Sequence, residues 1–488
     1  MAILNLLYLV SCVLIAVYGF HSLTLTLLYI WQNRRHPTAL PTSEANWPTV
    51  TIQLPIYNEQ YVVERLLAAC VALDYPRDKL QIQVLDDSTD DTREIVQRAI
   101  EVWRAEGVDI EHVTRPTRVG YKAGALQHGL ASARGEFLAV FDADFLPPRD
   151  FLKRTLHGFT DPRVGCVQAR WGHVNPNYSW LTRAQAAAID IHFGVEQEVR
   201  SRYGLLMNFN GAAGLWRRQC IEEAGGWQAE TLTEDLDLSY RAQLAGWRFH
   251  FLNDLRVPSE IPVQLNAYKR QQFRWAKGSI QTARKLLGTL WQSPLPWYKK
   301  IFGTFHLTGY VVHPLMLVVL ATMVPVNSRP LPLHLPPWIV IAAFGPWLLY
   351  WASRAAVNEP ASYKLTLLIT LILVGTGMAL NNTKAILEAL VGIKSGFERT
   401  PKFNIRQTGE TWGQNQYALP REPMLWFEAG VMLYSIWMVA LSVQRELWGL
   451  TPWLLIYAMG FGYFVWLSFY QSWEQTRARE PRQAEWPA

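Results

Sequence analysis

The sequence contains only four cysteines, and they are widely separated: Cys12, Cys70, Cys166 and Cys220. No two of them form a Cys-x-x-Cys pair, so they predict neither a zinc site nor a disulfide framework, and we expect free thiols in a reducing compartment. No basic run is long enough to indicate a nucleic-acid partner, although the net charge is +6. With an isoelectric point near 9.0, that charge suits an anionic membrane leaflet or a phosphorylated substrate.

Charged side chains are also absent from residues 1–33, and Arg34 and Arg35 follow at once. A cleaved signal peptide would have a basic start, a shorter apolar core and a small-residue cleavage site. This segment is instead long enough to span a bilayer, and its basic end indicates that the C-terminal side lies in the cytoplasm. We therefore expect residues 1–35 to form an N-terminal transmembrane helix.

Half of the 488 residues are apolar and 22 are Trp, which favours a membrane protein with aromatic belts. Residues 47–265 nevertheless have the pattern of a soluble α/β domain. Strand-like runs at 48–54, 81–85 and 137–141 alternate with helical patterns, one of them starting near Asp91 and another near Gln60 with Asn58 as its cap. The alternation predicts a doubly wound, mainly parallel sheet with ligands at the carboxyl ends of its strands.

Apolar tracts dominate the remainder, near 305–326, 337–351, 365–380, 425–441 and 452–469. We expect amphipathic interface helices at 266–303, transmembrane or interfacial helices at 304–382, and two transmembrane helices at 424–472. The polar segment 383–423 and the short basic tail 473–488 are rich in Lys and Arg, which favours a cytoplasmic position for both.

These side assignments require an even number of crossings between the soluble domain and segment 383–423, yet three tracts lie between them. One tract should therefore be re-entrant or lie along the interface, which gives five crossings. Otherwise one side assignment is wrong. The sequence does not identify the tract.

Two carboxylates, Asp142 and Asp144, follow the predicted strand 137–141. One small residue separates them, so they can offer hard oxygen ligands to Mg²⁺ or Mn²⁺. An ion held there would neutralise the charge that develops on a leaving nucleotide. The alternative is a solvated acidic turn.

Asp86 and Asp87 end the strand at 81–85 and could bind the base and ribose hydroxyls of a nucleotide. Their alternative role is to cap the next helix. Lys122 lies at a predicted helix start after a glycine-containing loop, which suits a cation facing phosphate, although a surface lysine would fit the same pattern.

Asp235 follows Thr233-Glu234 at the start of an amphipathic helix. Sugar transfer to a hydroxyl needs a base that accepts the proton. Partial desolvation by Trp216 or Trp227 would raise the proton affinity of Asp235 toward that role. A capping-type helix start is the alternative.

Gln271, Arg274 and Trp275 occupy positions i, i+3 and i+4, so a helix would place them on one face. Trp can stack on a sugar ring, Gln can bond its hydroxyls and Arg can bind phosphate oxygens. The alternative is an amphipathic helix on the membrane surface, and both descriptions can hold together.

Together, Asp87, Asp142-Ala143-Asp144, Thr233-Glu234-Asp235 and Gln271-Gln272-Phe273-Arg274-Trp275 resemble the signature of processive, membrane-integrated family 2 glycosyltransferases. Residues 122–126, 209–214 and 271–280 are most similar to cellulose-synthase-like proteins of the mannan and glucan-backbone type. The resemblance implies a GT-A fold and a metal-dependent reaction that inverts the anomeric carbon of GDP-mannose or UDP-glucose.

The resemblance also implies a role for each matching residue. Asp235 would be the base, and Asp142 and Asp144 would serve the metal and the nucleotide. The remaining assignments are Asp87, Lys122 and Arg274 for the nucleotide-sugar and Glu234, Gln271 and Trp275 for the acceptor.

Residues 397–402 resemble the family's FxVTxK gating loop, which implies gating roles for Phe397, Thr400 and Lys402. Arg399 stands where that pattern has valine, which weakens the assignment. Only a short tail follows the last apolar tract, so we do not expect the C-terminal cyclic-dinucleotide sensor domain that bacterial cellulose synthases can carry.

The leading hypothesis is a polymerase that extends a β-linked hexose polymer (β-1,4-mannan, glucomannan or glucan) and passes it through its own helices. It would lie in a bacterial inner or plasma membrane with a cytoplasmic catalytic domain, and its partners would be the growing polysaccharide and membrane lipid, not nucleic acid. The closest alternative transfers one sugar to a membrane lipid and stops. A transporter or receptor with a degenerate enzyme-like domain predicts broken motifs, whereas every carboxylate position is intact.

Overall fold

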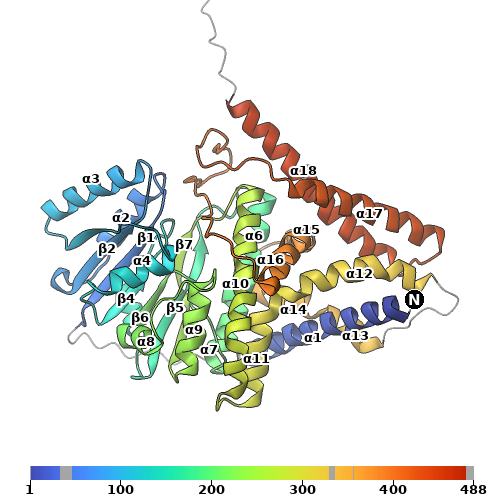
Figure 1. Ribbon diagram of the computed structural model, residues 1–488, viewed down its shortest axis with the longest axis horizontal. Coiled ribbons are helices and arrows are strands. Elements are labelled where there is room, and N and C mark those ends of the chain that lie inside the picture. The colour runs from blue at the N-terminus through green and yellow to red at the C-terminus, as the bar shows by residue number, and fades with distance from the viewer. Residues whose placement is uncertain (1, 33–46, 329–335, 356, 480–488) are drawn as a thin grey trace, which may run out of the picture.

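The computed structural model describes residues 2–32, 47–328, 336–355 and 357–479 (Figure 1). Within these ranges the strands form one seven-stranded sheet in the order β3-β2-β1-β4-β6-β5-β7. The strands are β1 (Val50–Ile56), β2 (Leu80–Asp86), β3 (Ile110–Thr114), β4 (Phe137–Val140), β5 (Val164–His173), β6 (Gly214–Arg217) and β7 (Arg248–Ser259).

The sheet is mainly parallel, as the alternation of strands and helices predicts. β1 to β4 run parallel to one another, β6 is antiparallel to both of its neighbours, and β5 pairs in parallel with β7. The polar residues of the central strands do not reach solvent: Gln53 Nε2 donates to Gln83 Oε1 at 3.0 Å, and both side chains are buried. Burial on both faces is typical of a parallel sheet covered by helices.

Helices cover both faces of the sheet. Side chains of α2 (Val63–Val71) and α3 (Thr92–Ala105) pack in one core, and those of α4 (Tyr121–Leu130), α8 (Arg218–Glu223) and α9 (Glu234–Leu244) pack in a second. α5 (Phe151–Leu156) belongs to the first core. This is the doubly wound arrangement predicted from the sequence.

The predicted cap of α2 is wrong. α2 begins at Val63 with Val62 at its N-cap, three residues beyond the expected start, and no side chain caps it. Asn58 instead adopts a φ of 55°, and its Oδ1 accepts from the Thr89 backbone N–H at 2.8 Å. Asn tolerates this left-handed backbone conformation. Its hydrogen bond to Thr89 joins the loop after β1 to the loop after β2.

A layer of helices lies between the sheet and the apolar end of the molecule (Figure 1). It contains α6 (Trp180–Ile191), the π-helical segment η2 (His192–Gln197), α7 (Glu198–Arg202) and α10 (Leu265–Gln292). The apolar helices are α1 (Ala2–Gln32), α11 (Trp297–Thr308), η3 (Gly309–Val311), α12 (Val312–Asn327), α13 (Pro337–Ala343), α14 (Gly345–Arg354), α15 (Ala361–Gly377), α16 (Ala379–Val391), α17 (Met424–Gln444) and α18 (Thr451–Arg479).

Among the described residues, four segments are long and apolar enough to cross a membrane: Ala2–Trp31, Trp297–Asn327, Met424–Gln444 and Thr451–Ala478. A fifth would be the pair α15 and α16, which is bent by 42° at its break. α18 continues past the predicted tail boundary at 473, and residues 33–35 and 480–488 of the predicted segments lie outside the described residues.

Three apolar tracts lie between the soluble domain and segment 383–423. The contacts of α13, α14 and α15 indicate which of the three lies along the interface. α13 and α14 run beside α1 in the same direction, since Ile339 packs in the cluster of Cys12 and Leu349 packs in the cluster of Leu25. α14 then ends on the interface layer, where Arg354 NH1 lies 3.2 Å from Asp190 Oδ2 of α6.

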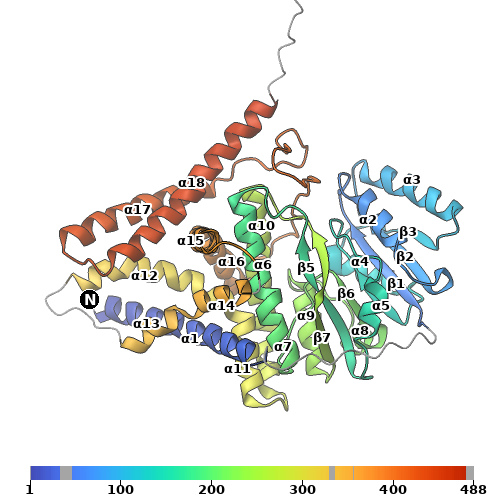
Figure 2. The same cartoon turned by 180° about the vertical axis from the view of Figure 1, so that it is seen from behind.

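α15 packs across α6 at the level of the interface layer (Figure 2). Leu367 packs with Ala187, and Val374 packs with Leu181, so both ends of α15 lie at the level of α6. Figure 2 shows α15 end-on while α12 and α17 extend sideways. Of the three tracts, α15 therefore has the orientation expected of the one that lies along the interface.

Candidate active site

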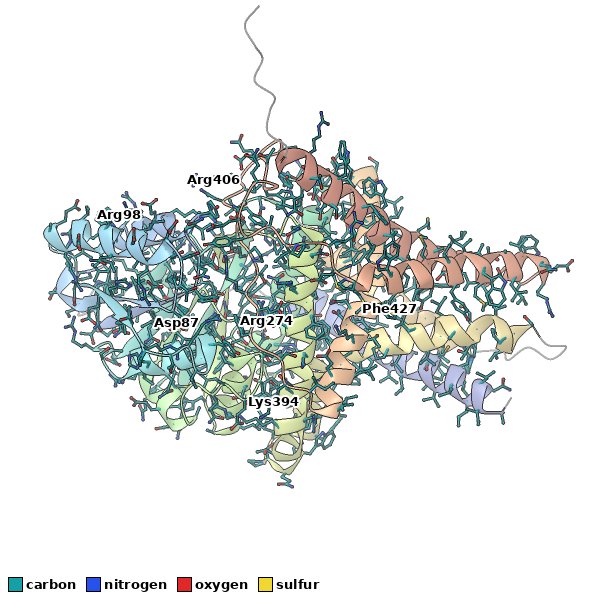
Figure 3. The ribbon with its side chains drawn as sticks, turned by 45° about the horizontal axis from the view of Figure 1, so that its top comes forward. Asp87, Arg98, Arg274, Lys394, Arg406 and Phe427 are labelled. Atoms are coloured by element: carbon teal, nitrogen blue, oxygen red, sulfur yellow. The ribbon has the colours of Figure 1, made fainter. Side chains whose placement is uncertain are left out.

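The twelve residues to which the family resemblance assigns a role all line a single cleft at the carboxyl ends of the central strands. The sheet, α10 and segment 397–402 enclose it; Figure 3 marks Asp87 on the sheet side and Arg274 on α10. Their roles stay predictions, but their convergence is a structural fact. They are Asp87, Lys122, Asp142, Asp144, Glu234, Asp235, Gln271, Arg274, Trp275, Phe397, Thr400 and Lys402. Asp86, also expected to bind the nucleotide, does not line the cleft: its carboxylate is buried and lies 2.8 Å from His112 Nε2.

Each aspartate after β4 is paired with a lysine from another part of the chain. Lys122 Nζ, at the first turn of α4, lies 2.5 Å from Asp142 Oδ1, and Lys402 Nζ lies 2.8 Å from Asp144 Oδ2. Asp144 also accepts from the Glu260 backbone N–H at 2.9 Å. The two carboxylates are thus held in place by charge-assisted hydrogen bonds.

Asp235 lies in the first turn of α9, as predicted. Burial, with the neighbouring charge of Glu234, raises the pKa of the Asp235 carboxyl to about 7 against the opposing charge of Lys122. The predicted cause of desolvation is wrong: Trp216 and Trp227 pack with Phe209 in the core, and neither is among the described residues that line the cleft.

Gly211 lets the backbone approach this carboxylate closely. It has a φ of +82°, and a Cβ built on it would lie 3.0 Å from Asp235 Oδ2 and 3.4 Å from Lys122 Nζ. Its carbonyl accepts from Lys122 Nζ at 2.8 Å. A glycine is required here both by the backbone conformation and by the space available.

Asp87 lines the cleft but is already engaged. Arg115 donates to both of its carboxylate oxygens, from Nε at 2.7 Å and from NH2 at 2.5 Å. Next to this pair the Arg118 guanidinium lies 3.3 Å from the centre of the Tyr57 ring. The cleft therefore offers a pre-oriented carboxylate beside a flat cationic surface.

One face of α10 forms the opposite wall, as the i, i+3, i+4 spacing predicts. Trp275 lies with its ring centre 6.5 Å from that of Trp171, in the tilted geometry of an aromatic pair. Arg274 NH1 donates to the Glu398 carbonyl at 2.5 Å and to Thr400 Oγ1 at 3.3 Å. Arg274 therefore joins α10 to segment 397–402 as well as lining the cleft.

Segment 397–402 crosses the cleft and is fixed at several points. The Phe397 ring stacks on Tyr121 with centroids 6.0 Å apart, and Arg274 lies 4.7 Å from the centre of that ring. Arg399, which replaces the family's valine, lies 3.0 Å from Glu59 Oε2. Through these contacts the segment joins α10 to the sheet side of the cleft.

Five further charged or amide residues of the cleft wall receive no role from the sequence pattern. Burial raises the pKa of Glu59 to about 8, with Arg399 opposing the shift, which makes Glu59 a second carboxyl with altered acidity. Its position directly after β1 could have indicated it, whereas Glu260 follows β7, a strand that the pattern does not reveal. The five residues are Glu59, Arg118, Asn210, Glu260 and Arg399.

In the described part of the chain, the cleft does not offer enough protein ligands to hold a divalent ion alone. Its carboxylates instead fit an ion that is bound together with the diphosphate of a substrate. Among the described residues, no group of three or more His, Cys, Asp or Glu side chains could hold a metal. Mg²⁺ is commonly bound by one or two carboxylates together with substrate phosphates. Asp142 and Asp144, separated by one residue, meet that requirement.

Comparison with known proteins agrees with this architecture. The family described as "Glycosyltransferase like family 2" matches residues 48–278. "Probable glucomannan 4-beta-mannosyltransferase 7" of Oryza sativa subsp. japonica is 42% identical over 320 residues, which cover 63% of this chain and 55% of that protein. "Glucomannan 4-beta-mannosyltransferase 2" of Arabidopsis thaliana is 38% identical, covering 71% and 65%. "Probable glucomannan 4-beta-mannosyltransferase 15" of Arabidopsis thaliana is 36% identical, covering 79% and 74%.

The chain therefore spans a little over half to about three quarters of the length of these relatives. Among solved structures, "Mannosyltransferase PcManGT from Pyrobaculum calidifontis in complex with GDP-Man and Mn2+" aligns with a TM-score of 0.53 and 21% identity. It covers 79% of this chain and 99% of that one. At this identity the similarity shows a shared fold.

A GT-A sheet with a carboxylate-lined cleft, joined to helices able to cross a membrane, defines a membrane-associated glycosyltransferase. More narrowly, the chain belongs to the family 2 glycosyltransferases, and the relatives named above, glucomannan 4-β-mannosyltransferases by name, place it in the cellulose-synthase-like group of that family.

Proposed function

We propose that this protein is an inverting hexosyltransferase that extends a β-1,4-linked mannan or glucomannan backbone from GDP-mannose. The observation that carries the proposal is the convergence in one cleft of Asp235, whose pKa is raised to about 7, with Asp142, Asp144 and Trp275. The similarity to glucomannan 4-β-mannosyltransferases supports the polymer, and the GDP-Man bound to the solved mannosyltransferase supports the donor.

In this reaction Asp235 accepts the proton of an acceptor hydroxyl while that oxygen bonds to the anomeric carbon of the donor. The bond between the anomeric carbon and the β-phosphate oxygen breaks, and GDP leaves with its electron pair. A base with a pKa near the working pH suits this proton transfer. Attack from the face opposite the diphosphate inverts the anomeric configuration.

Asp142 and Asp144 are the residues that would hold a Mg²⁺ or Mn²⁺ ion. Such an ion, when bound, neutralises negative charge on the leaving diphosphate. Lys122 and Lys402, which pair with these aspartates, supply positive charge at the same place. Asp87, Lys122 and Arg274 would contact the donor, since all three line the cleft.

The acceptor would lie against α10. Trp275 offers a face for stacking on a sugar ring, and Gln271 and Glu234 offer hydrogen-bonding groups to its hydroxyls. Segment 397–402, with Phe397, Thr400 and Lys402 in the cleft wall, would enclose the donor and exclude water.

By length and composition the fifth candidate span is the pair α15 and α16, but from the orientation of α15 we propose five crossings: α1, α11 with α12, α13 with α14, α17 and α18. α15 then lies along the interface, and the sheet and segment 383–423 share the cytoplasmic side. The chain then crosses the membrane an even number of times between the sheet and segment 383–423, as their shared side requires. Arginines follow α1 and lie near the end of α18, which favours the cytoplasmic side for both ends. The growing polymer would pass through these helices.

The test uses the full-length protein in lipid nanodiscs with a panel of GDP-mannose, GDP-glucose and UDP-glucose, monitored by released nucleotide. We expect release from GDP-mannose and a long product that β-mannanase digests. A product of one sugar on a lipid would instead establish the alternative activity. Release from UDP-glucose alone would overturn the donor assignment.

A further inference from the structure

η2 (His192–Gln197) is a π-helical segment between α6 and α7, and it places two of its side chains on one residue of the cleft. Residues five apart in an α-helix are separated by about 140° around the axis. The i→i+5 hydrogen bonds of a π-helix bring them closer to alignment, and such segments are frequent at functional sites. Here His192 and Gln197, five apart, both contact Asn210.

The hydrogen bonds around Asn210 fix the identity of each atom. Gln197 Nε2 lies 2.7 Å from the Asn208 carbonyl oxygen, which can only accept, so the nitrogen must face it. The same nitrogen lies 2.7 Å from Asn210, so the Asn210 atom at that position is the acceptor Oδ1. Asn210 Nδ2 therefore faces His192.

The tautomer of His192 follows from the same reasoning. Asn210 Nδ2 donates to His192 Nε2 at 3.0 Å, so Nε2 carries no proton. His192 Nδ1 must then carry the ring proton and donate it to Glu196 Oε2 at 3.1 Å. Histidine tautomers are set by such partners. Glu196, His192 and Gln197 thus hold one orientation of the Asn210 amide.

Asn210 is adjacent to the catalytic carboxylate. It lines the cleft, and the next residue, Gly211, approaches Asp235 and accepts from Lys122. On its other side, Phe209 N donates to Ser239 Oγ at 2.9 Å, and that hydroxyl donates to the Asp235 carbonyl at 2.6 Å. A shift of Asn210 would therefore displace the segment that contacts the proposed base.

The opposite face of η2 packs against the apolar helices. Val195 of η2 is buried in a cluster with Leu25 of α1 and Leu349 of α14. Because η2 contacts α1 and α14 on one side and Asn210 on the other, its position relative to the cleft depends on the membrane helices.

From these contacts we infer that His192 and Gln197 are positioning residues for the proposed transfer. They hold Asn210 so that its amide nitrogen, with its second N–H, faces the acceptor sugar beside Asp235. The inference rests on the proposed function, and it assigns to the π-helical segment the placement of the acceptor hydroxyl against the base.

The test compares His192→Leu, which removes the acceptor for Asn210, with His192→Gln, whose side-chain oxygen can replace Nε2. His250→Leu is the matched control, since His250 is partly buried in β7 and outside the cleft wall. The full-length protein in nanodiscs is assayed for kcat and KM with GDP-mannose and a manno-oligosaccharide acceptor. GDP affinity is measured by calorimetry and stability by thermal unfolding.

We expect His192→Leu to lower kcat by about 10- to 100-fold, because small misplacements of reacting groups have effects of this size. GDP affinity and thermal unfolding should stay close to wild type, His192→Gln should recover most of the rate, and His250→Leu should match wild type. Wild-type kcat in His192→Leu, equal losses in the Leu and Gln variants, or a parallel loss of GDP affinity would overturn the inference.

A second measurement does not depend on activity. Selective ¹⁵N-histidine labelling, with the His192→Gln spectrum to identify the signal, should show a proton on Nδ1 of His192. A proton on Nε2 would contradict the inference. If the wild type transfers no sugar, the proposed function fails while this measurement still decides the geometry. If the wild type is active and His192→Leu equals it, only the inference fails.

Discussion

Gly211→Ala separates the effect of backbone strain from the effect of crowding the proposed base. Gly211 has a φ of +82°, and an L-residue in the left-handed region costs about 1–2 kcal/mol. The added methyl group would also lie 3.0 Å from Asp235 Oδ2 and 3.4 Å from Lys122 Nζ. The carboxylate or the loop must therefore move by a few tenths of an ångström.

Gly246→Ala is the matched control. Gly246 has a φ of +95°, and no atom lies within 4 Å of the position of its Cβ, so it carries a similar backbone cost without any contact. Both variants should lose about 1–2 kcal/mol of stability, measured by thermal unfolding in nanodiscs. Only Gly211→Ala should lose transfer activity, by at least about tenfold, since that corresponds to only about 1.4 kcal/mol of transition-state stabilisation.

The assay is the initial rate of GDP release from GDP-mannose in the presence of a manno-oligosaccharide acceptor. Wild-type rates in Gly211→Ala would refute the close approach of this backbone to a catalytic carboxylate. An equal loss of rate in Gly246→Ala would show that strain alone accounts for the effect.

Three further predictions concern charge and metal. Glu234→Gln removes a like charge beside Asp235, so it should lower the pKa of that carboxyl and move the acid limb of the rate profile to lower pH; an unmoved or raised limb would contradict the coupling. Lys269 and Glu428 form a fully buried ion pair at 2.6 Å, so Lys269→Met alone should cost about 3–5 kcal/mol, and adding Glu428→Leu should recover much of it. The exposed Arg134→Ala should change thermal unfolding by less than about 1 kcal/mol, and equal losses at both sites would refute this comparison. Chelation of divalent ions should abolish transfer and Mg²⁺ or Mn²⁺ should restore it, because the cleft offers an ion two closely spaced carboxylates; full activity in chelator would exclude the metal role.

The convergence of the site could be predicted from the sequence because it depends on local pattern and on one general rule. Asp87 and Asp142 each follow a strand-like run, alternating at 81–85 and continuously apolar at 137–141, and parallel strands place their carboxyl ends on the same edge. The spacing of Gln271, Arg274 and Trp275 likewise fixes a shared face on any helix. These arguments need no knowledge of distant contacts.

The remaining features depend on contacts between distant parts of the chain. β6 has only four residues and pairs antiparallel with β4 and β5, so its short sequence carries no distinct strand pattern. Lys402 reaches Asp144 across 258 residues of sequence, and Arg399 reaches Glu59 across a still longer separation. Nearness in sequence suggests Trp216 and Trp227 as the residues that desolvate Asp235, whereas burial beside Glu234 accounts for its raised pKa.

Asp235→Asn tests the central claim most directly, because it removes the proton acceptor and preserves the size of the side chain. The account predicts that GDP binding, measured by calorimetry, stays close to wild type while polymer formation from GDP-mannose is lost. Polymer formation at the wild-type rate by this variant would contradict the account.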